Sequence, residues 1–166
     1  MPDTIIYREE QRFNQWWLWL LIYGLVALMW WGFFQQIILG QPWGTNPGPD
    51  WLVWLLWLLL GVGLPALFHI MKLVVEVRPN QVDIHYRPFI NRSIAILEID
   101  HLKARTYKPI QEYGGWGIKG WSKQRIAYNT SGNRGVELTL HDGRTVMLGS
   151  QQPEELALAI ESQMRR

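Results

Sequence analysis

Charged residues are absent from two long stretches of this chain, and this segregation constrains its fold more than any other feature. Residues 13–49 contain no Asp, Glu, Lys or Arg, and neither do residues 51–71, so Asp50 is the only charged residue between Arg12 and Lys72. The mean hydropathy of −0.07 hides this division because it averages two unlike parts. A soluble fold needs no such segregation, whereas the hydrocarbon core of a bilayer excludes charged side chains. The sequence therefore predicts an integral membrane protein.

Two apolar runs are long enough to cross a bilayer as helices. Residues 16–39 (WWLWLLIYGLVALMWWGFFQQIIL) and residues 51–71 (WLVWLLWLLLGVGLPALFHIM) number 24 and 21, and at about 1.5 Å rise per residue each reaches across a hydrocarbon core of about 30 Å. Glycines and a proline at residues 61–65 predict a kink or close packing against a neighbouring helix. A cleaved signal peptide is the alternative for the first run. Its length, the mixed charges at residues 8–12 and the lack of a small-residue cleavage site disfavour that interpretation.

The distribution of Lys and Arg beside the two runs predicts the orientation of the hairpin. The connecting loop, residues 40–50, has no Lys or Arg, whereas Arg8 and Arg12 precede the first run and Lys72 follows the second. Cationic flanks stay on the cytoplasmic side, so both termini are predicted to be cytoplasmic, at an inner or thylakoid membrane. The chain then divides into a cytoplasmic N-terminal flank, a two-helix transmembrane hairpin and a cytoplasmic domain, at residues 1–15, 16–71 and 72–166.

After the second run the pattern changes to short alternating runs that are typical of β-strands. An Asp142–Gly143 pair between two such runs indicates a hairpin turn. Pro153 begins a terminal segment with an acidic first turn and apolar residues at helical spacing, which predicts an amphipathic helix. About seven strands in a meander are predicted, at residues 73–78, 81–87, 93–99, 102–107, 125–128, 136–141 and 144–148.

Four segments of this region resemble the pleckstrin-homology-like (PH-like) domains that follow two membrane spans in bacterial proteins. They are VEVRPNQVDIHY, IAILEIDHLKA, GVELTLHDGRTVMLGSQQPEEL and the terminal helix. The resemblance covers residues 73–164 and implies a PH-like barrel of about seven strands with a C-terminal α-helix. It implies a fold far more than an activity, because one fold hosts many functions. Specific inositol-lipid recognition is not expected, since the first hairpin of the region carries only Arg78 as a basic residue.

The chain offers few residues for chemistry. It has no cysteine, so disulfides and thiolate metal sites are excluded, and its four histidines are not spaced as metal ligands. No nucleophile or acid–base motif is recognisable, so we predict no catalytic residue, no metal site and no enzymatic activity. His69, near the cytoplasmic end of the second run, has two interpretations. It is either an interfacial or helix-capping histidine, or it binds a tetrapyrrole pigment or donates a hydrogen bond to a partner subunit.

Two aromatic surfaces are candidates for contact with a partner or with lipid. Trp51, Trp54 and Trp57 recur every three residues on one face of the second run, and this face has three candidate contacts: lipid, the first helix or a partner's membrane helix. The second surface is a glycine-rich rim at residues 113–135, whose tryptophans alternatively fill the core of their own loops. Its aromatic and basic residues suit headgroups or a protein partner: Trp116, Trp121, Lys119, Lys123, Arg125 and Arg134.

These features together predict a non-enzymatic, membrane-anchored accessory protein that binds a larger membrane protein complex, as an assembly factor or auxiliary subunit. Beyond residue 71 there are 14 Lys and Arg against 10 Asp and Glu. This excess suits contact with membrane lipids and is too diluted by acids to predict nucleic-acid binding. Photosystem assembly is a further hypothesis, motivated by the tryptophan-dense runs and by His69. The alternative function is a membrane-lipid-binding or membrane-stress-responsive PH-like module.

Overall fold

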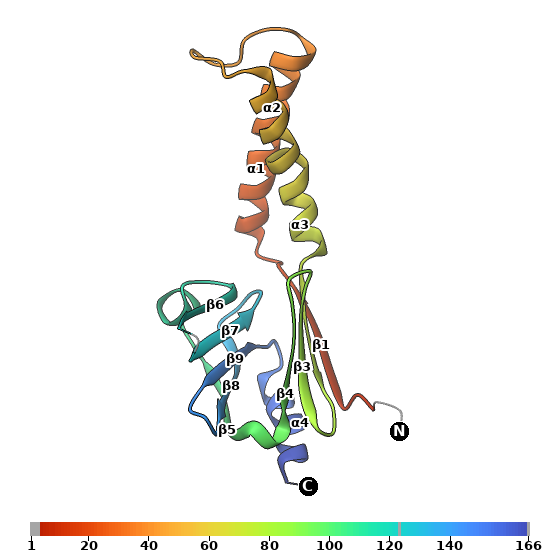
Figure 1. Ribbon diagram of the computed structural model, residues 1–166, viewed down its shortest axis with the longest axis vertical. Coiled ribbons are helices and arrows are strands. Elements are labelled where there is room, and N and C mark those ends of the chain that lie inside the picture. The colour runs from red at the N-terminus through yellow and green to blue at the C-terminus, as the bar shows by residue number, and fades with distance from the viewer. Residues whose placement is uncertain (1–3, 123, 166) are drawn as a thin grey trace. The chain divides into compact units, whose positions relative to one another are not determined.

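The computed structural model describes residues 4–122 and 124–165, without the side chains of Trp121 and Ser122. The chain forms two compact units. One is a helical hairpin of residues 14–70. The other is a β domain that combines the residues before 14 with those from 71 onward (Figure 1).

The hairpin consists of two helices joined by a loop. Both are long and apolar enough to cross a membrane, at Trp16–Ile38 and Asp50–Ile70, and their ends lie within one residue of the predicted runs. Each helix changes between α and π geometry along its length. The segments are α1 (Trp16–Phe33), the π-helix η1 (Phe34–Ile38), α2 (Asp50–Leu56), the π-helix η2 (Trp57–Gly63) and α3 (Leu64–Ile70).

The two helices approach each other closely at Gly61, which is buried. Pro65 has no N–H, so it cannot donate the α-helical hydrogen bond to the carbonyl of Gly61, four residues earlier. The indole Nε1 of Trp30, on the first helix, donates to this carbonyl at 3.2 Å. A kink or close packing was predicted at these glycine and proline positions. Close packing is observed at Gly61, where an added Cβ would lie 3.4 Å from Met29 Cβ on the first helix.

The loop between the helices is tied back to them. The side-chain amide of Gln36 donates to the Gly48 carbonyl and to Asp50 Oδ1, both at 2.8 Å. A Cβ atom at Gly32 would lie 2.6 Å from the ring of Trp43, so only glycine leaves room for that ring. The one charged residue of the hairpin is therefore hydrogen-bonded at the loop end.

The β domain contains two sheets and a terminal helix (Figure 1). The first sheet has the order β1-β2-β3-β4, with strands β1 (Tyr7–Arg12), β2 (Lys72–Val77), β3 (Gln81–Arg87) and β4 (Ile90–Ala95). The second sheet has the order β5-β8-β9-β7-β6, with strands β5 (Ile99–Thr106), β6 (Gly117–Ser122), β7 (Arg125–Asn129), β8 (Arg134–Leu140) and β9 (Thr145–Gly149). The remaining elements are the 3-10 turn η3 (Ile96–Glu98), the π-turn η4 (Pro109–Tyr113) and helix α4 (Pro153–Met164).

The core of this domain is formed by one face of each sheet and by α4. Leu156 and Ile160, two members of the apolar stripe predicted for the terminal helix, are completely buried. Most residues on both faces of β2 and β3 are buried, and the completely buried ones alternate along the strands on the face that packs into the core. The fully buried members are Leu73, Val75, Val77, Val82 and Ile84.

Strand β1 precedes the hairpin in sequence but is an edge strand of the β domain. Its core-facing residues Glu9 and Gln11 are polar, and both are buried. Glu9 accepts hydrogen bonds from Ser150 Oγ at 2.6 Å and from the Gln151 N–H at 2.7 Å. The amide of Gln11 donates to the Gly149 carbonyl at 2.7 Å. These bonds tie β1 to the connection between β9 and α4.

The strand arrangement corrects the predicted meander and barrel. Within the described residues there are nine strands, and β7 runs parallel to β9, which no meander allows. The predicted strand at 93–99 is interrupted by η3, which passes the chain from one sheet to the other. The two sheets do not close into a barrel in the part of the chain that the structure describes. The physical reason is that alternation specifies which face of a strand is buried, and not which strand it pairs with.

Candidate functional site

The aromatic face predicted on the second helix packs partly against the first helix. The ring of Trp57 stacks on Phe33 at a centroid distance of 4.5 Å and lies 5.2 Å from Trp30. Trp54 meets Phe33 edge-on at 4.7 Å. Trp51 is 65 % exposed. Contact with the first helix, one of the three predicted roles, is therefore observed for Trp54 and Trp57, while Trp51 presents most of its surface outward.

His69 lies in the last turn of α3, where its ring contacts Trp19 edge-on at 4.7 Å. Its Nδ1 is 2.8 Å from the Pro65 carbonyl oxygen. Because a carbonyl can only accept, Nδ1 carries the proton and Nε2 is the acceptor nitrogen of the neutral ring. Histidine ligands of metals use this arrangement, and so does a histidine that bonds the last carbonyls of a helix. The helix-capping and pigment-binding interpretations of His69 share this geometry, whereas a hydrogen bond donated to a partner subunit would need a second N–H on the ring.

The glycine-rich rim is organised by one buried asparagine. Asn129, at the end of β7, is completely buried. Its Oδ1 accepts from the Gly117 N–H at 2.8 Å, and its Nδ2 donates to the Tyr107 hydroxyl at 2.8 Å. Gly117 has a φ of +114°, which favours glycine. The Gly117 N–H is therefore hydrogen-bonded inside the domain and is not available to an external anion such as phosphate.

An apolar hollow of about 250 Å³, the Trp116 hollow, lies beside this rim. Trp116 is held in one position because its indole Nε1 donates to the Gly132 carbonyl at 2.8 Å. Ile110, on the π-turn η4, is 64 % exposed. A fixed indole next to an exposed aliphatic side chain suits the insertion of an apolar group from a partner. The hollow is lined by Tyr107, Lys108, Pro109, Ile110, Gln111, Trp116 and Asn133.

Two of the predicted basic rim residues are paired within the domain. Arg125 Nη2 lies 3.0 Å from Glu112 Oε2, and its guanidinium lies 4.9 Å from the centre of the Tyr113 ring. Arg134 forms an ion pair with Glu154, in the first turn of α4. Both arginines therefore hold parts of the fold together, and less of their charge is available to an external anion.

Of the remaining predicted rim residues, Lys119 and the backbone of Trp121 lie on β6. Lys119 is exposed on this strand. Lys123 and the side chain of Trp121 lie outside the described residues. Trp116 is therefore the predicted rim tryptophan whose side chain the structure describes, and it lines a hollow.

A network of four charged residues lies beside Tyr113. Arg105, on β5, donates through Nη2 to Glu112 Oε2 at 2.8 Å and to Glu137 Oε2 at 2.7 Å. The hydrogen bond from Arg105 is the main reason why the pKa of Glu112 is below its usual range. The same bond raises the pKa of Arg105. The network balances two guanidinium groups, including that of Arg125, against two carboxylates, so it is a cross-link and leaves no free acid–base pair.

The Arg105→Met variant is expected to be less stable than the parent at neutral pH, by about 2 kcal/mol, because both carboxylates lose a charged donor. The lowered pKa of Glu112 contributes stability above about pH 4.3, the ordinary value for glutamate. That contribution disappears as the pH falls through the lowered pKa, so the difference between variant and parent should shrink in acid. Thermal unfolding in detergent across this pH range measures it. Arg144→Met, which removes an exposed ion pair with Asp142, is the control and should change little at any pH; a pH-independent difference for Arg105→Met would contradict this account.

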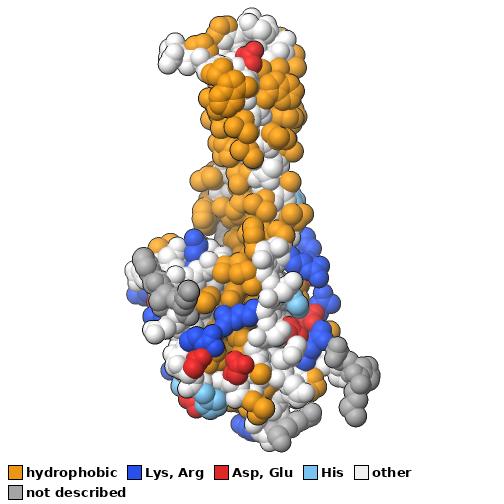
Figure 2. Space-filling model, in the orientation of Figure 1, with side chains coloured by type: hydrophobic (Ala, Val, Ile, Leu, Met, Phe, Trp, Pro, Cys, Tyr) orange, Lys and Arg blue, Asp and Glu red, His pale blue; other side chains and the backbone are white. Residues whose placement is uncertain are grey.

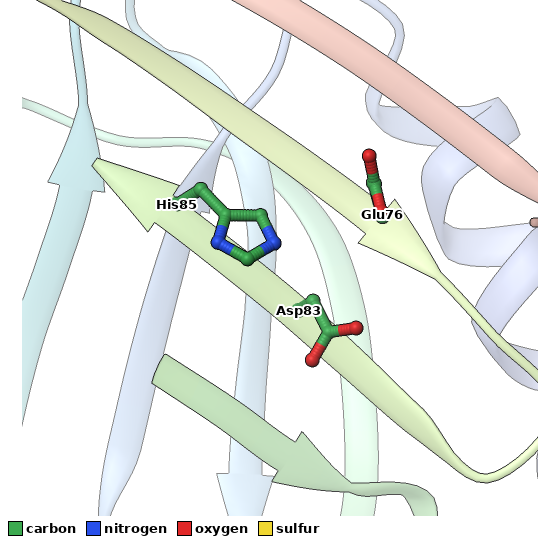
Figure 3. A group of neighbouring side chains, drawn as sticks. All are labelled: Glu76, Asp83 and His85. Atoms are coloured by element: carbon green, nitrogen blue, oxygen red, sulfur yellow. The ribbon is translucent and has the colours of Figure 1, made fainter. Parts of the chain in front are cut away.

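Three potential metal ligands meet on the outer face of the first sheet. Figure 3 shows Glu76 on β2 beside Asp83 and His85 on β3, and their ligand atoms lie within 4.8 Å of one another. Arg78 already bridges the two carboxylates, with contacts of 3.0 Å to each, and Asp83 also accepts from Ser93 Oγ at 2.5 Å. A guanidinium in this position supplies the positive charge that a cation would bring. We assign this cluster a structural role.

A model of the family described as a family of unknown function (DUF6141) matches residues 1–165. The chain belongs to the DUF6141 family. No curated protein matches it significantly. The DUF6141 match spans β1, the hairpin and the rest of the β domain, which agrees with the structural finding that the segment before the hairpin is part of the β domain.

Two residues of the site in this DUF6141 member were not predicted from sequence. Asn129 lies in the polar segment NTSGNRG, which reads as a surface loop, and Ile110 stands alone in the polar segment YKPIQEY. Pro109 before Ile110 is a signal for a turn, but nothing in the local sequence predicts that the Ile110 side chain is exposed. Nothing in the local sequence marks Asn129, because its partners lie 12 and 22 residues away.

Proposed function

We propose that this protein spans a membrane with its two helices and carries its β domain on the cytoplasmic side. Only 22 % of the first apolar window and 11 % of the second are buried within the chain. Figure 2 shows a largely hydrophobic surface on the face of the hairpin that is in view. Soluble proteins rarely expose an apolar surface of this size, whereas a bilayer covers it.

The position of β1 supports an uncleaved first helix and termini on the same side. Cleavage after the first helix would remove β1, whose Glu9 and Gln11 are buried in the β domain. Arg12, at the end of β1, pairs in register with Lys72, at the start of β2, so the chain leaves and re-enters the domain at neighbouring positions. The loop of the hairpin has no Lys or Arg, and the positive-inside rule therefore makes the side of the β domain cytoplasmic. An inner or thylakoid membrane fits this topology.

The β domain itself is proposed to be a divergent PH-like domain. Two mainly antiparallel sheets followed by a C-terminal helix that packs into the core support this relationship. Two features depart from the expected pattern: the first strand comes from before the hairpin, and β7 pairs with β9 in parallel. The proposed relationship to PH-like domains therefore rests on the arrangement of the sheets and the terminal helix. The proposed function rests on the site.

The β domain is proposed to act as a non-enzymatic binding module that attaches the protein to a larger membrane protein complex, as an assembly factor or auxiliary subunit. The single observation that carries this proposal is the Trp116 hollow. Its indole is fixed by a hydrogen bond, so little conformational entropy is lost when a partner binds it. Ile110 stands exposed at its edge, and Lys108, which also borders the hollow, supplies a cation for the rim of an interface.

The Ile110→Gln variant tests this role. Replacing an exposed apolar anchor by a polar side chain of similar length should reduce recovery of the partner complex about tenfold or more in mild-detergent affinity purification. The fold should be unaffected, because the side chain is exposed. Leu158→Gln, which makes the same kind of change at a residue of α4 that is 65 % exposed, is the matched control. Stoichiometric recovery of one complex with the parent and the control, and its loss with Ile110→Gln, is the expected result; equal recovery by all three would refute the assignment.

The identity of the recovered complex also separates the more specific hypotheses. Recovery of photosystem subunits with bound pigment would support photosystem assembly and a ligand role for His69. Recovery of the protein alone, bound to liposomes in a salt-sensitive manner, would instead support the lipid-binding PH-like module. In either case, the cations Arg12, Lys72 and Arg87 at one end of the first sheet favour contact with lipid, and they lie apart from the Trp116 hollow.

A further inference from the structure

Three cations form a row across one end of the first sheet. Arg12 on β1 pairs in register with Lys72 on β2, and Lys72 pairs in register with Arg87 on β3. Residues directly opposite one another on neighbouring strands place their side chains on the same face of the sheet. Arg12 and Arg87 are exposed and Lys72 is partly exposed. These three residues are called the basic row.

One carboxylate accompanies the basic row. Glu10 lies 3.0 Å from both Arg12 Nη2 and Lys72 Nζ. Hydrogen bonds from Lys72 and Arg12 lower the pKa of Glu10, so it stays ionised at neutral pH. Arg87 forms no ion pair with any residue in the ranges 4–122 and 124–165. Three cations against one carboxylate leave an excess of positive charge, which is concentrated at Arg87.

An exposed aromatic residue lies next to Arg87. Strands β3 and β4 are joined by a tight turn, closed by a hydrogen bond of 2.8 Å from the Phe89 N–H to the Tyr86 carbonyl. Phe89 is 55 % exposed, and Pro88 beside it is exposed. A cation and an aromatic side chain on one tight turn can act together at a membrane surface, where the ring enters the headgroup region and the cation meets phosphate.

The covalent chain keeps this turn near the ends of both helices. Lys72 is two residues beyond Ile70, the last residue of the second helix, and two residues span at most about 7 Å. Directly paired residues of neighbouring strands lie about 5 Å apart, so Arg87 is fixed to Lys72 by the register of the sheet. Arg12 is four residues before Trp16, where the first helix begins. Whatever the orientation of the β domain, this end of the sheet is tethered to both membrane spans.

We propose that the basic row and Phe89 bind the phosphate groups of anionic membrane lipids and dock this end of the β domain on the bilayer. The inference rests on the proposed membrane insertion. Anionic lipid is the occupant that the structure favours, because the excess charge is positive, the turn is apolar at its tip and the covalent connection limits its distance from the ends of both helices. The site is separate from the Trp116 hollow, so lipid docking and partner binding are testable independently.

The chain contains no cysteine, so single cysteine variants carry a nitroxide spin label at one defined position. Phe89→Cys reports on the proposed contact, Asn80→Cys reports on the exposed turn at the opposite end of β3, and Leu59→Cys reports on an exposed position within the second span. The full chain is reconstituted in nanodiscs of phosphatidylcholine with or without phosphatidylglycerol. Collision rates with oxygen, which concentrates in lipid, and with a water-soluble nickel chelate then give the depth of each label.

With phosphatidylglycerol present, the Phe89→Cys label should be accessible to oxygen and protected from the nickel chelate, while the Asn80→Cys label should show the reverse. Adding Arg87→Gln to the Phe89→Cys variant should lower the ratio of lipid-embedded to water-exposed label about fivefold in these nanodiscs, and have little effect without anionic lipid. A Phe89→Cys label that is equally water-exposed in both lipids, while the Leu59→Cys label is embedded, would overturn this inference alone. A water-exposed Leu59→Cys label would overturn the membrane insertion itself.

Discussion

Replacing Glu9 with alanine is expected to lower the free energy of unfolding of the β domain by about 3 kcal/mol. The side chain of Glu9 is a buried carboxylate that accepts from Ser150 Oγ at 2.6 Å, from the Gln151 N–H at 2.7 Å and from the Tyr7 hydroxyl at 2.8 Å. Truncation removes a charged acceptor and leaves buried donors without it, and each such loss costs about 1–3 kcal/mol. The effect should appear as reduced hydrogen-exchange protection of β1 and of the β9–α4 connection in the detergent-solubilised protein.

Glu10→Ala is the matched control, because it makes the same change at the next residue of the same strand. Glu10 points to the opposite face, where it pairs with Arg12 and Lys72 at the surface, and an exposed pair of this kind contributes at most about 1 kcal/mol. Its loss should leave exchange at the β9–α4 connection unchanged. Equal effects of the two variants would mean that β1 is not held by the Glu9 contacts.

The positions of the two apolar helices were accurately predicted, because each is marked by a continuous apolar segment of the sequence. The ends of the two apolar runs, residues 16–39 and 51–71, mark the ends of two helices, and the structure agrees with them within one residue. The packing of the hairpin was less accessible. The bond from Trp30 to the Gly61 carbonyl joins residues that are 31 apart in sequence, and it is explained only when the missing N–H of Pro65 is considered together with the neighbouring helix.

Strand β1 was missed because its inward-facing residues are polar. The segment YREEQR shows no alternation of apolar and polar residues, which is the pattern that marks a half-buried strand. Glu9 and Gln11 are tolerated in the interior because their partners, about 140 residues away, satisfy them. Such a strand can be recognised only when its partners, residues 149–151, are known to lie beside it.

The division of the strands into two sheets could also not be predicted from local sequence patterns. The alternating segment SIAILEI reads as one strand, yet residues 96–98 form a turn that transfers the chain to the second sheet. The parallel pairing of β7 with β9 places residues at distant positions side by side. The resemblance to PH-like domains supplied the correct inventory of a mainly β domain with a terminal helix, and the barrel that it implied is replaced by two open sheets.

Replacing Asn129 with alanine is expected to disorganise the glycine-rich rim and to lower the free energy of unfolding by about 3 kcal/mol. One side chain accepts from the Gly117 N–H and donates to the Tyr107 hydroxyl, both at 2.8 Å and both in the interior. Alanine leaves these two buried groups unpaired, which costs about 1–3 kcal/mol for each. Because Gly117 directly follows Trp116, and Tyr107 lines the Trp116 hollow, the shape of the hollow should be lost together with the bonds.

Two measurements on the full chain in detergent separate the structural effect from the functional one. Hydrogen exchange at residues 107–118 should rise in Asn129→Ala, and recovery of the partner complex should fall as it does for Ile110→Gln. Ile110→Gln itself should lower recovery without raising exchange, because its side chain is exposed. Asn91→Ala, the same substitution at an exposed position of β4, is the control and should change neither quantity. An Asn129→Ala protein that exchanges like the control would show that Asn129 does not organise the rim. Increased exchange with full recovery of the complex would instead place the partner-binding surface away from the Trp116 hollow.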